Sequence, residues 1–576
     1  MKMKTGMGKK LRYGGVTALL TAAIIAIVII VNVIFSALAQ KNLWYTDLTP
    51  ELFFTLSENC VTLMNEGDSA FEKSTSPIKK IDEYRAAAKA ADPNFKDKDI
   101  VINIIFCNDE LTWTEDTAQR YVLETAKQLR DEFPDHINIE YIDIIRNPTA
   151  VTRFGSNVST SSVIIECKND YDYAIDEKTG EKTAIADQFR VRSLKDFYVF
   201  DTDTSEEPWA YNGEKIFAAS ILAVTRADTP VVCITTTHGE RLPGESFLLT
   251  LANAGYEVKP IDLSKDEIDA KCRLIIISSP TSDFMVADGL SDSDEIEKLD
   301  KFLDGDSSLM VFMDPTLTTR LTNLEDYLEE WGVKFDRESV KDQPGKYEPF
   351  RIQDNSQALD ENGYNIVGNY VDYGLGGEIT KNLREMNRKV VFPNVMSISY
   401  SDAVSIGGFK ESEDGEILGD YGYLNVNSAY RQIFDLFVSS ENAVAWTGQN
   451  TEPTETAKNG NNFKFMTITV EDSYIQESNY TTTNEASYVI ATGCSEFALD
   501  NILHGQYGNN MFLEYTLRII AHEPVPVGLT FKPFGDYTID TITTAEATQY
   551  TVVFTVVPLI LSLGIGIFVI VRRKNR

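Results

Sequence analysis

A histidine and a glutamate stand one residue apart after an apolar run in the middle of this chain. His238 and Glu240 follow the run 230–235, with a glycine between them. A histidine beside a carboxylate can act as a general base or bind a metal ion. The same residues also suit a tight turn, in which the glycine permits a sharp exit from a strand and His238 only forms hydrogen bonds. Asp314 ends a later apolar run and precedes Pro315, so it is either a further site residue or an ordinary turn former.

The segments around these residues alternate between strand and helix patterns. Apolar runs at 230–235, 274–277 and 309–313 are separated by helical patterns at 246–254 and 291–303. Such runs are typical of parallel strands that are covered on both faces. Doubly wound folds bind ligands at the carboxyl ends of these strands. We therefore predict a doubly wound, flavodoxin/glutamine-amidotransferase-like α/β domain over 229–540 with insertions, and ligand binding at His238, Glu240 and Asp314.

A second α/β domain is predicted before it. Its elements are strand patterns at 100–106, 137–142 and 161–167 and a helical pattern at 114–133. This order resembles a thioredoxin-like domain, which we place at 40–212, with a linking helix at 213–228. A redox role would need two cysteines at the start of the helix, and only Cys107 is there, so the resemblance in fold does not carry the chemistry.

Both ends of the chain carry long apolar runs. Residues 16–39 and 550–571 are long enough to cross about 30 Å of hydrocarbon. The basic tails 1–15 and 572–576 flank them, so the positive-inside rule places both termini in the cytoplasm and the large domain outside. A cleaved signal peptide is the alternative for the first run. We predict a two-span protein of the bacterial cell membrane with an ectodomain that contains both α/β domains.

Composition and missing motifs exclude several functions. The chain has 576 residues and a formal net charge of −34, which argues against binding to nucleic acid. Its six cysteines include no pair at zinc spacing, and no nucleophile elbow accompanies His238, so we predict no catalytic residue, no metal and no cofactor. No phosphate-binding loop of the form Gly-x-x-x-x-Gly-Lys-Ser/Thr occurs, so any ATPase must be a partner chain.

Short motifs occur in a recognisable order along the chain. They are Asp47-Leu48-Thr49, Asn147-Pro148, Gly213-Glu214-Lys215, Thr237-His238-Gly239-Glu240, Gly255-Tyr256-Glu257-Val258, Met313-Asp314-Pro315, Gly493-Cys494-Ser495-Glu496-Phe497 and Asn509-Asn510-Met511-Phe512. Together they resemble the auxiliary component of gliding-motility-type ABC transport systems. Two positions depart from the family pattern: Thr237 replaces a glycine, and Cys494 stands where an acid is common. The resemblance implies a complex in which a separate ABC ATPase subunit and a multi-span permease subunit carry out transport.

These observations predict a non-catalytic auxiliary membrane subunit that contacts substrate or partner proteins. The first alternative is an extracytoplasmic hydrolase with a site near His238. The second is a membrane-anchored protein that binds a polysaccharide or a peptide, so that an envelope polymer or a peptide becomes the partner.

Overall fold

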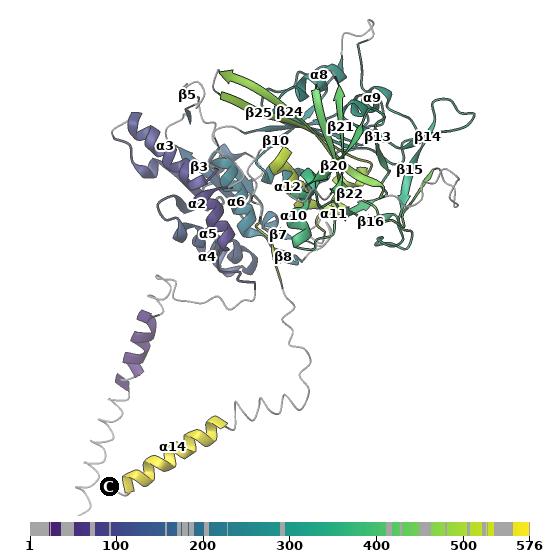
Figure 1. Ribbon diagram of the computed structural model, residues 1–576. Coiled ribbons are helices and arrows are strands. Elements are labelled where there is room, and N and C mark those ends of the chain that lie inside the picture. Colours follow the sequence, from purple (N-terminus) through teal and green to yellow (C-terminus); the bar gives the residue numbers. More distant parts are fainter. Residues whose placement is uncertain are drawn as a thin grey trace, which may run out of the picture. The chain divides into compact units, whose positions relative to one another are not determined.

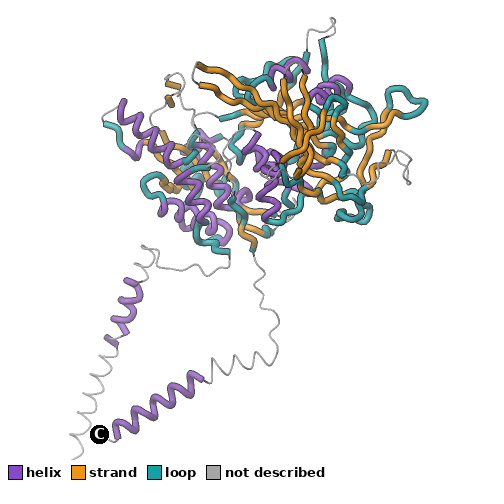
Figure 2. Tube along the Cα trace, in the orientation of Figure 1, coloured by secondary structure: helices purple, strands orange, loops and turns teal. Residues whose placement is uncertain are grey.

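The structure is a computed structural model that carries side chains. It describes residues 22–23, 25–35, 51–68, 75–91, 94–155, 158–169, 174–175, 182–183, 189–200, 207–226, 229–287, 294–410, 417–426, 429–447, 462–478, 481–503, 507–520, 526, 528–534 and 557–574. The chain divides into two units, Met1–Lys532 and Pro533–Arg576. The first unit contains a mixed α/β arrangement with many strands (Figures 1 and 2).

A four-stranded sheet organises the N-terminal region. Its order is β2-β1-β3-β6, in which β1 is parallel to β2 and β3 is antiparallel to β1 and β6. The strands are β1 (Ile100–Phe106), β2 (Ile137–Tyr141), β3 (Val163–Asn169) and β6 (Phe189–Arg192). The helices are α2 (Glu58–Glu66), α3 (Pro77–Ala91), α4 (Glu110–Glu115), α5 (Thr117–Glu132) and α6 (Gly213–Val224). The strands and the helix predicted between 100 and 167 are present here, and the assignment of 40–212 as a thioredoxin-like domain stays a prediction.

Short elements complete this region. They are η1 (Asp97–Asp99), η2 (Pro148–Phe154), η3 (Leu194–Phe197), β4 (Ala174–Ile175), β5 (Lys182–Thr183), β7 (Tyr198–Val199), β8 (Ala210–Tyr211) and β26 (Lys532–Pro533). A buried ion pair and two hydrogen bonds tie α6 to distant parts of the first unit. Lys215 pairs with Glu514 at 2.7 Å, and the Glu214 carboxylate accepts hydrogen bonds from the backbone and side chain of Ser57.

Five neighbouring parallel strands form one half of a large sheet. They stand in the order β10-β9-β11-β12-β25. Their bounds are β9 (Val231–Thr235), β10 (Glu257–Ile261), β11 (Cys272–Ser278), β12 (Ser308–Phe312) and β25 (Thr481–Thr492). Helices α7 (Glu245–Asn253), α8 (Glu295–Leu303) and α9 (Thr322–Glu330) connect or follow these strands.

The central parallel strands β9 and β12 are buried on both faces. In β9, Val232 and Ile234 belong to one hydrophobic cluster, whereas Val231 and Cys233 belong to another. Successive side chains of a strand point to opposite faces, so the two clusters lie on either side of the sheet. The first cluster includes residues of α7, α10 (Gly374–Glu385) and α12 (Asn509–Ile520), and the second includes residues of α8 and α9. This double burial explains why these strands are continuous apolar runs in the sequence.

The other half of the same sheet is antiparallel, which corrects the predicted doubly wound architecture. Next to β25 come β24 (Lys464–Ser478), β22 (Ala429–Val438), β21 (Ile417–Val426) and β20 (Ser405–Lys410). Each is antiparallel to its neighbour. The alternation of strands and helices predicts only the parallel half. The antiparallel strands contain glycine, serine and charged residues, which dilute the apolar signal.

Smaller elements surround the large sheet. The strands are β13 (Val333–Phe335), β14 (Arg337–Ser339), β15 (Tyr347–Gln353), β16 (Asn365–Val367), β17 (Asn369–Tyr370), β18 (Val391–Pro393), β19 (Ile398–Tyr400) and β23 (Val444–Thr447). The remaining helical turns are η4 (Ser495–Ala498) and α11 (Asp500–Leu503). Figure 1 shows α10, α11 and α12 near β22, whereas α8 and α9 lie toward the other side of the sheet.

The prediction of two membrane spans is overturned. Within the residues that the structure describes, no helix is both long and apolar enough to cross a bilayer. Helix α14 (Val557–Lys574) ends in three basic residues. The helical residues described in the first apolar run are 22–23 and 25–35. The rest of 16–39 and 550–571 lies outside the described residues, as do the tail 1–15 and residues 575–576.

Candidate functional site

His238 lies in the loop that follows β9, at the carboxyl edge of the parallel strands. Its two neighbours both have positive φ angles, 88° at Thr237 and 72° at Gly239. Glycine adopts this region freely, whereas a β-branched threonine is strained there. The family resemblance places a glycine at the position of Thr237, and this backbone geometry gives the physical reason. His238 itself is buried, with only 5% of its surface exposed.

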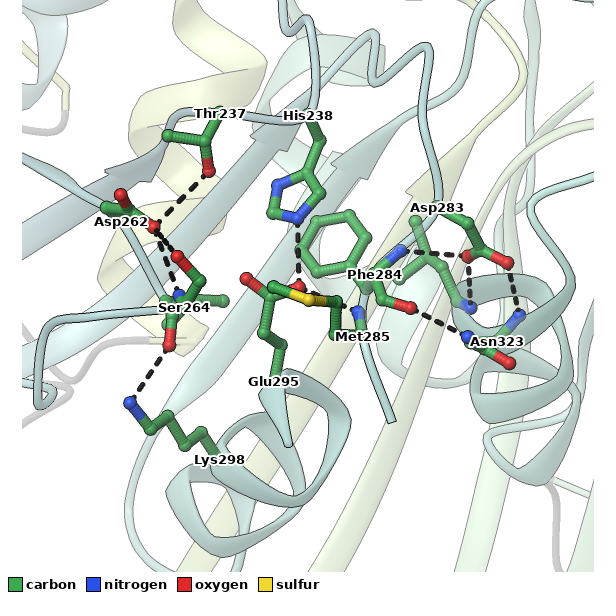
Figure 3. A network of polar contacts seen from close by, with 12 residues as sticks. Thr237, His238, Asp262, Ser264, Asp283, Phe284, Met285, Glu295, Lys298 and Asn323 are labelled. Carbon is green, nitrogen blue, oxygen red and sulfur yellow. Dashed lines mark hydrogen bonds and ion pairs between the residues drawn. The ribbon is translucent and has the colours of Figure 1, made fainter. Parts of the chain in front are cut away.

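Two carboxylates, Glu240 and Glu295, hold the imidazole ring between them, and Figure 3 shows the contact with Glu295. The His238 Nδ1 atom lies 3.1 Å from Glu240 Oε1, and Nε2 lies 2.9 Å from Glu295 Oε2. The backbone amide of His238 donates a further hydrogen bond of 2.6 Å to Glu240 Oε2. The Phe284 ring stacks on the imidazole at a centroid distance of 3.9 Å and an interplanar angle of 10°. We call His238, Glu240 and Glu295 the His238 cluster.

Glu295 reaches the histidine from the first turn of α8. Asp294 caps this helix, because its carboxylate accepts a hydrogen bond of 2.7 Å from the amide of Glu297. Glu295 then shares a helix face with Leu299 and Leu303, which are four and eight residues further on and buried. A carboxylate near a helix N-terminus is also stabilised by the helix dipole. Glu295 is therefore placed by the same face that buries the helix, and its exposure is 0%.

The cluster holds His238 in its protonated form. Burial alone would lower the pKa of His238, but the hydrogen bonds and negative charges of Glu240 and Glu295 outweigh burial and raise the pKa to about 9. For Glu240 the directions are reversed: burial alone would raise its pKa. The hydrogen bonds from His238 and from nearby backbone amides outweigh burial and lower the pKa. At neutral pH the ring is a cation between two acceptors. A protonated imidazole with both nitrogens engaged cannot accept a proton as a general base.

The loop that follows β11 is fastened to the same cluster. The carbonyl of His238 accepts hydrogen bonds from the amides of Thr281 and Ser282, at 2.8 and 2.9 Å. The amide of Met285 donates a bond of 2.7 Å to Glu295 Oε2. Two loops that are about 40 residues apart in the sequence are thereby fixed to one another.

Asp283 fixes the other side of this loop to α9. Its carboxylate accepts hydrogen bonds from the amides of Asn323 and Leu324, at 2.8 and 3.2 Å. The Asn323 side chain in turn donates a bond of 2.7 Å to the carbonyl of Phe284. Asp283 thus satisfies amides of the first turn of α9, which a helix leaves unpaired. Figure 3 shows this network beside His238 and Glu295.

Asp314 is placed apart from the His238 cluster. It follows β12, and β11 lies between β12 and β9 in the sheet. Strands are spaced about 4.8 Å apart, so the two ends are separated by roughly 10 Å. The Asp314 carboxylate accepts hydrogen bonds of 2.7 Å from the amide and hydroxyl of Thr316, and one of 3.4 Å from the Ser279 hydroxyl. The structure therefore brings His238 and Glu240 together and gives Asp314 a turn-forming set of partners.

One acceptor of the cluster is left over. The Glu295 Oε1 atom is buried and has no hydrogen-bond partner among the described residues. Among the residues that the structure describes, no group of three or more His, Cys, Asp or Glu side chains is arranged to hold a metal ion. The geometry is that of an ionic clamp that fixes two loops, and its contacts are made within the protein.

The His238 cluster lies within the segment that matches a known family. Residues 229–367 match the family model described as ABC-type uncharacterized transport system. The match supports an ABC transport auxiliary family over this segment. The predicted resemblance is confirmed at that level, and the gliding-motility type stays a prediction. No curated protein matches the chain. The auxiliary-family segment extends from β9 to β16, so it contains the His238 cluster and Asp314. A family of this kind implies association with a membrane and with other transport proteins.

Two members of the site were missed by sequence reasoning. Glu295 stands in the acidic stretch 291–295, which resembles a solvated helix start. Its spacing of four and eight residues from Leu299 and Leu303 was the available signal that it faces inward. Phe284 carries no comparable signal, because a single aromatic residue in a loop does not reveal which ring it stacks on.

Proposed function

We propose that this chain is a non-catalytic auxiliary subunit of an ABC-type transport complex, of the gliding-motility type, whose ATPase and multi-span permease are separate chains. The match of residues 229–367 to the auxiliary family carries this proposal. The absence of a phosphate-binding loop from the sequence supports the assignment of ATP hydrolysis to a partner. Residues 40–212 and 229–540 would act as two domains linked by 213–228.

We further propose that the loops around the His238 cluster contact a partner protein. Three exposed apolar side chains flank the buried cluster: Leu242 is 64% exposed, Met285 40% and Val286 43%. We call these three residues the apolar rim. Leu242 follows Glu240 by two residues, and Met285 donates its amide to Glu295. A rigid loop that presents apolar side chains loses little entropy on binding, which favours recognition of a partner.

In this proposal His238, Glu240 and Asp314 do not contact the partner protein and contribute to its binding indirectly. The ionic clamp and the Asp314 turn hold the loops at the carboxyl edge of the sheet in one conformation. A general base at His238 would require the unprotonated ring, and the pKa of about 9 makes that form a minor one at neutral pH. The clamp therefore supports a positioning role over a catalytic one.

Affinity purification of the full chain in a mild detergent, followed by mass spectrometry, tests the assignment. We expect an ABC ATPase and a multi-span permease to be recovered with the wild-type protein. Recovery of the protein without both would overturn the proposed complex. Hydrolysis of a substrate by the wild type that is lost in His238→Gln, with the fold intact, would overturn the non-catalytic role.

A paired set of variants tests the apolar rim. Leu242→Ser combined with Met285→Ser removes two exposed apolar side chains without disturbing the buried cluster. We expect this double variant to lose the permease on purification. Ile406→Ser is the matched control, since Ile406 is 57% exposed and lies on β20, outside the auxiliary-family segment. Equal recovery of the permease by both variants would contradict the proposed contact.

A further inference from the structure

A row of aromatic side chains crosses the antiparallel end of the large sheet. The centroids of Tyr421 and Tyr423 are 6.2 Å apart, and those of Tyr423 and Tyr430 are 6.4 Å apart. At the inner end of the row, Tyr421 stacks on Phe434 at 5.7 Å and 19°. Phe434 is 6% exposed, whereas Tyr430 at the outer end is 46% exposed. The row is therefore anchored in the core at one end and open to solvent at the other. We call Tyr421, Tyr423 and Tyr430 the tyrosine strip.

Glycines in the neighbouring strands make room for aromatic rings. A Cβ atom on Gly407 would lie 3.0 Å from the Tyr421 ring, and one on Gly419 would lie 2.2 Å from the Tyr373 ring. Glycine inside a strand weakens the strand, and it often marks a place where another group approaches the backbone closely. Here the rings themselves make that approach, so the glycines help to fix Tyr421 and Tyr373 against the sheet.

Uncharged polar side chains flank the tyrosine strip on the same face. Ser405 and Gln432 are the cross-strand partners of Tyr423, and Asn425 is the partner of Tyr430. Directly paired residues of antiparallel strands share a face. Ser405 and Asn425 are exposed, and Gln432 is half-buried. Hydroxyl and amide groups thus alternate with ring surfaces, and no lysine, arginine, aspartate or glutamate is among these three partners.

We propose that the tyrosine strip binds a neutral glycan strand. Aromatic faces stack on the apolar C–H faces of sugar rings, and tyrosine adds a hydroxyl that can bond to the sugar. Amide side chains offer both donors and acceptors to sugar hydroxyl and acetamido groups. The net charge of −34 repels an anionic polymer, and the strip offers no cation to offset it. This inference names a class of substrate for the proposed subunit, and it rests on the proposal that the subunit contacts substrate.

The mixture of aromatic rings and polar side chains on this face also differs from the core of a typical protein–protein interface. The core of a protein interface is a continuous apolar patch from which water is excluded. The strip instead places a hydroxyl or an amide beside each of its outer rings. Its outer residues, Tyr423 and Tyr430, are the ones we expect to stack on successive sugar units, because Tyr421 is packed against Phe434.

Calorimetric titration of the purified full-length protein with hexa-N-acetylchitohexaose, a neutral hexosamine chain, tests the proposal. We expect the wild type to bind it, and Tyr423→Ala and Tyr430→Ala each to weaken binding by about tenfold, as the loss of one aromatic stack predicts. Tyr430→Phe should retain most of the affinity because the ring remains. Ile406→Ala, at an even-numbered position on the opposite face of β20, is the matched control and should bind like the wild type.

Absence of binding by the wild type would overturn the proposal, as would unchanged binding by both alanine variants. Tyr430 is exposed enough for its alanine variant to fold, so this variant decides the question if Tyr423→Ala does not fold. Purification of the same variants separates this inference from the proposed complex. Recovery of the ATPase and permease with a variant that no longer binds the glycan shows that the two can fail independently.

Discussion

The two halves of the large sheet bury and present side chains in different ways. All five residues of β9 and all five of β12 are buried, with one cluster on each face. At the antiparallel end, Ile406 is 57% exposed and Tyr430 is 46% exposed. Strands β9 and β12 can therefore offer groups to a ligand only through the loops at their ends. The antiparallel half offers side chains from the strands themselves, so a glycan or another extended ligand can lie along it.

Removal of His238 from the clamp in the parallel half should cause the largest loss in the free energy of unfolding. His238→Ala leaves Glu240 and Glu295 facing one another without the cation that separates them. Breaking a buried ion pair by removal of one partner costs about 3–5 kcal/mol. We expect a loss of this size in the free energy of unfolding from urea denaturation. His136→Ala is the control, because His136 pairs with Asp82, whose side chain is 59% exposed, and such pairs contribute about 0–1 kcal/mol. Similar losses for the two variants would contradict the clamp.

Truncation of one isoleucine in each half tests the difference in burial directly. Ile276→Ala in β11 creates a cavity at a position with 0% exposure, and we expect a loss of about 2–5 kcal/mol. Ile406→Ala in β20 removes an exposed side chain, and we expect a change within about 0.5 kcal/mol. Urea denaturation of both variants gives the comparison. A loss in stability at Ile406 that equals the loss at Ile276 would contradict the exposure of Ile406 at the antiparallel end.

The pH dependence of stability should report on His238. Its pKa rises from 6.5 to about 9 on folding. Because the folded pKa is the higher one, the stabilisation is fully present below pH 6.5 and is lost as the pH rises through 9. We expect a decrease of roughly 2–3 kcal/mol in the free energy of unfolding over this window. The decrease should be absent from His238→Gln, and a slope that persists in that variant would assign it to other groups.

Replacement of Thr237 by glycine should cause a small increase in the free energy of unfolding. Thr237 has a φ of 88°, where a β-branched residue is strained and glycine is not. Among the described residues, its side chain makes one hydrogen bond, of 3.4 Å, to Asp262. We expect Thr237→Gly to raise the free energy of unfolding by about 1 kcal/mol. Thr236→Gly is the control and should destabilise, since Thr236 has no positive φ and its hydroxyl bonds to the carbonyl of Ile261.

Sequence patterns predicted the parts of this fold that depend on local burial. The apolar runs at 230–235, 274–277 and 309–313 became β9, β11 and β12, because strands covered on both faces must be apolar at every position. The antiparallel strands β20 to β22 were missed, since exposed glycines and polar residues hide their alternation. The predicted membrane spans were wrong for a different reason. Among the residues that the structure describes, no helix is long and apolar enough to cross a bilayer.

The sequence by itself determined that His238 and Glu240 follow a buried strand, and its motifs pointed to an ABC transport auxiliary family. Only the tertiary structure decided what the histidine does. Its second carboxylate comes from Glu295, 57 residues further on, and its stacking ring comes from Phe284. It also decided that β25, from near the end of the chain, pairs with β12 and joins the two halves of the sheet. Local periodicity reports whether a residue is buried, but the choice of partner depends on packing between segments that are distant in the chain.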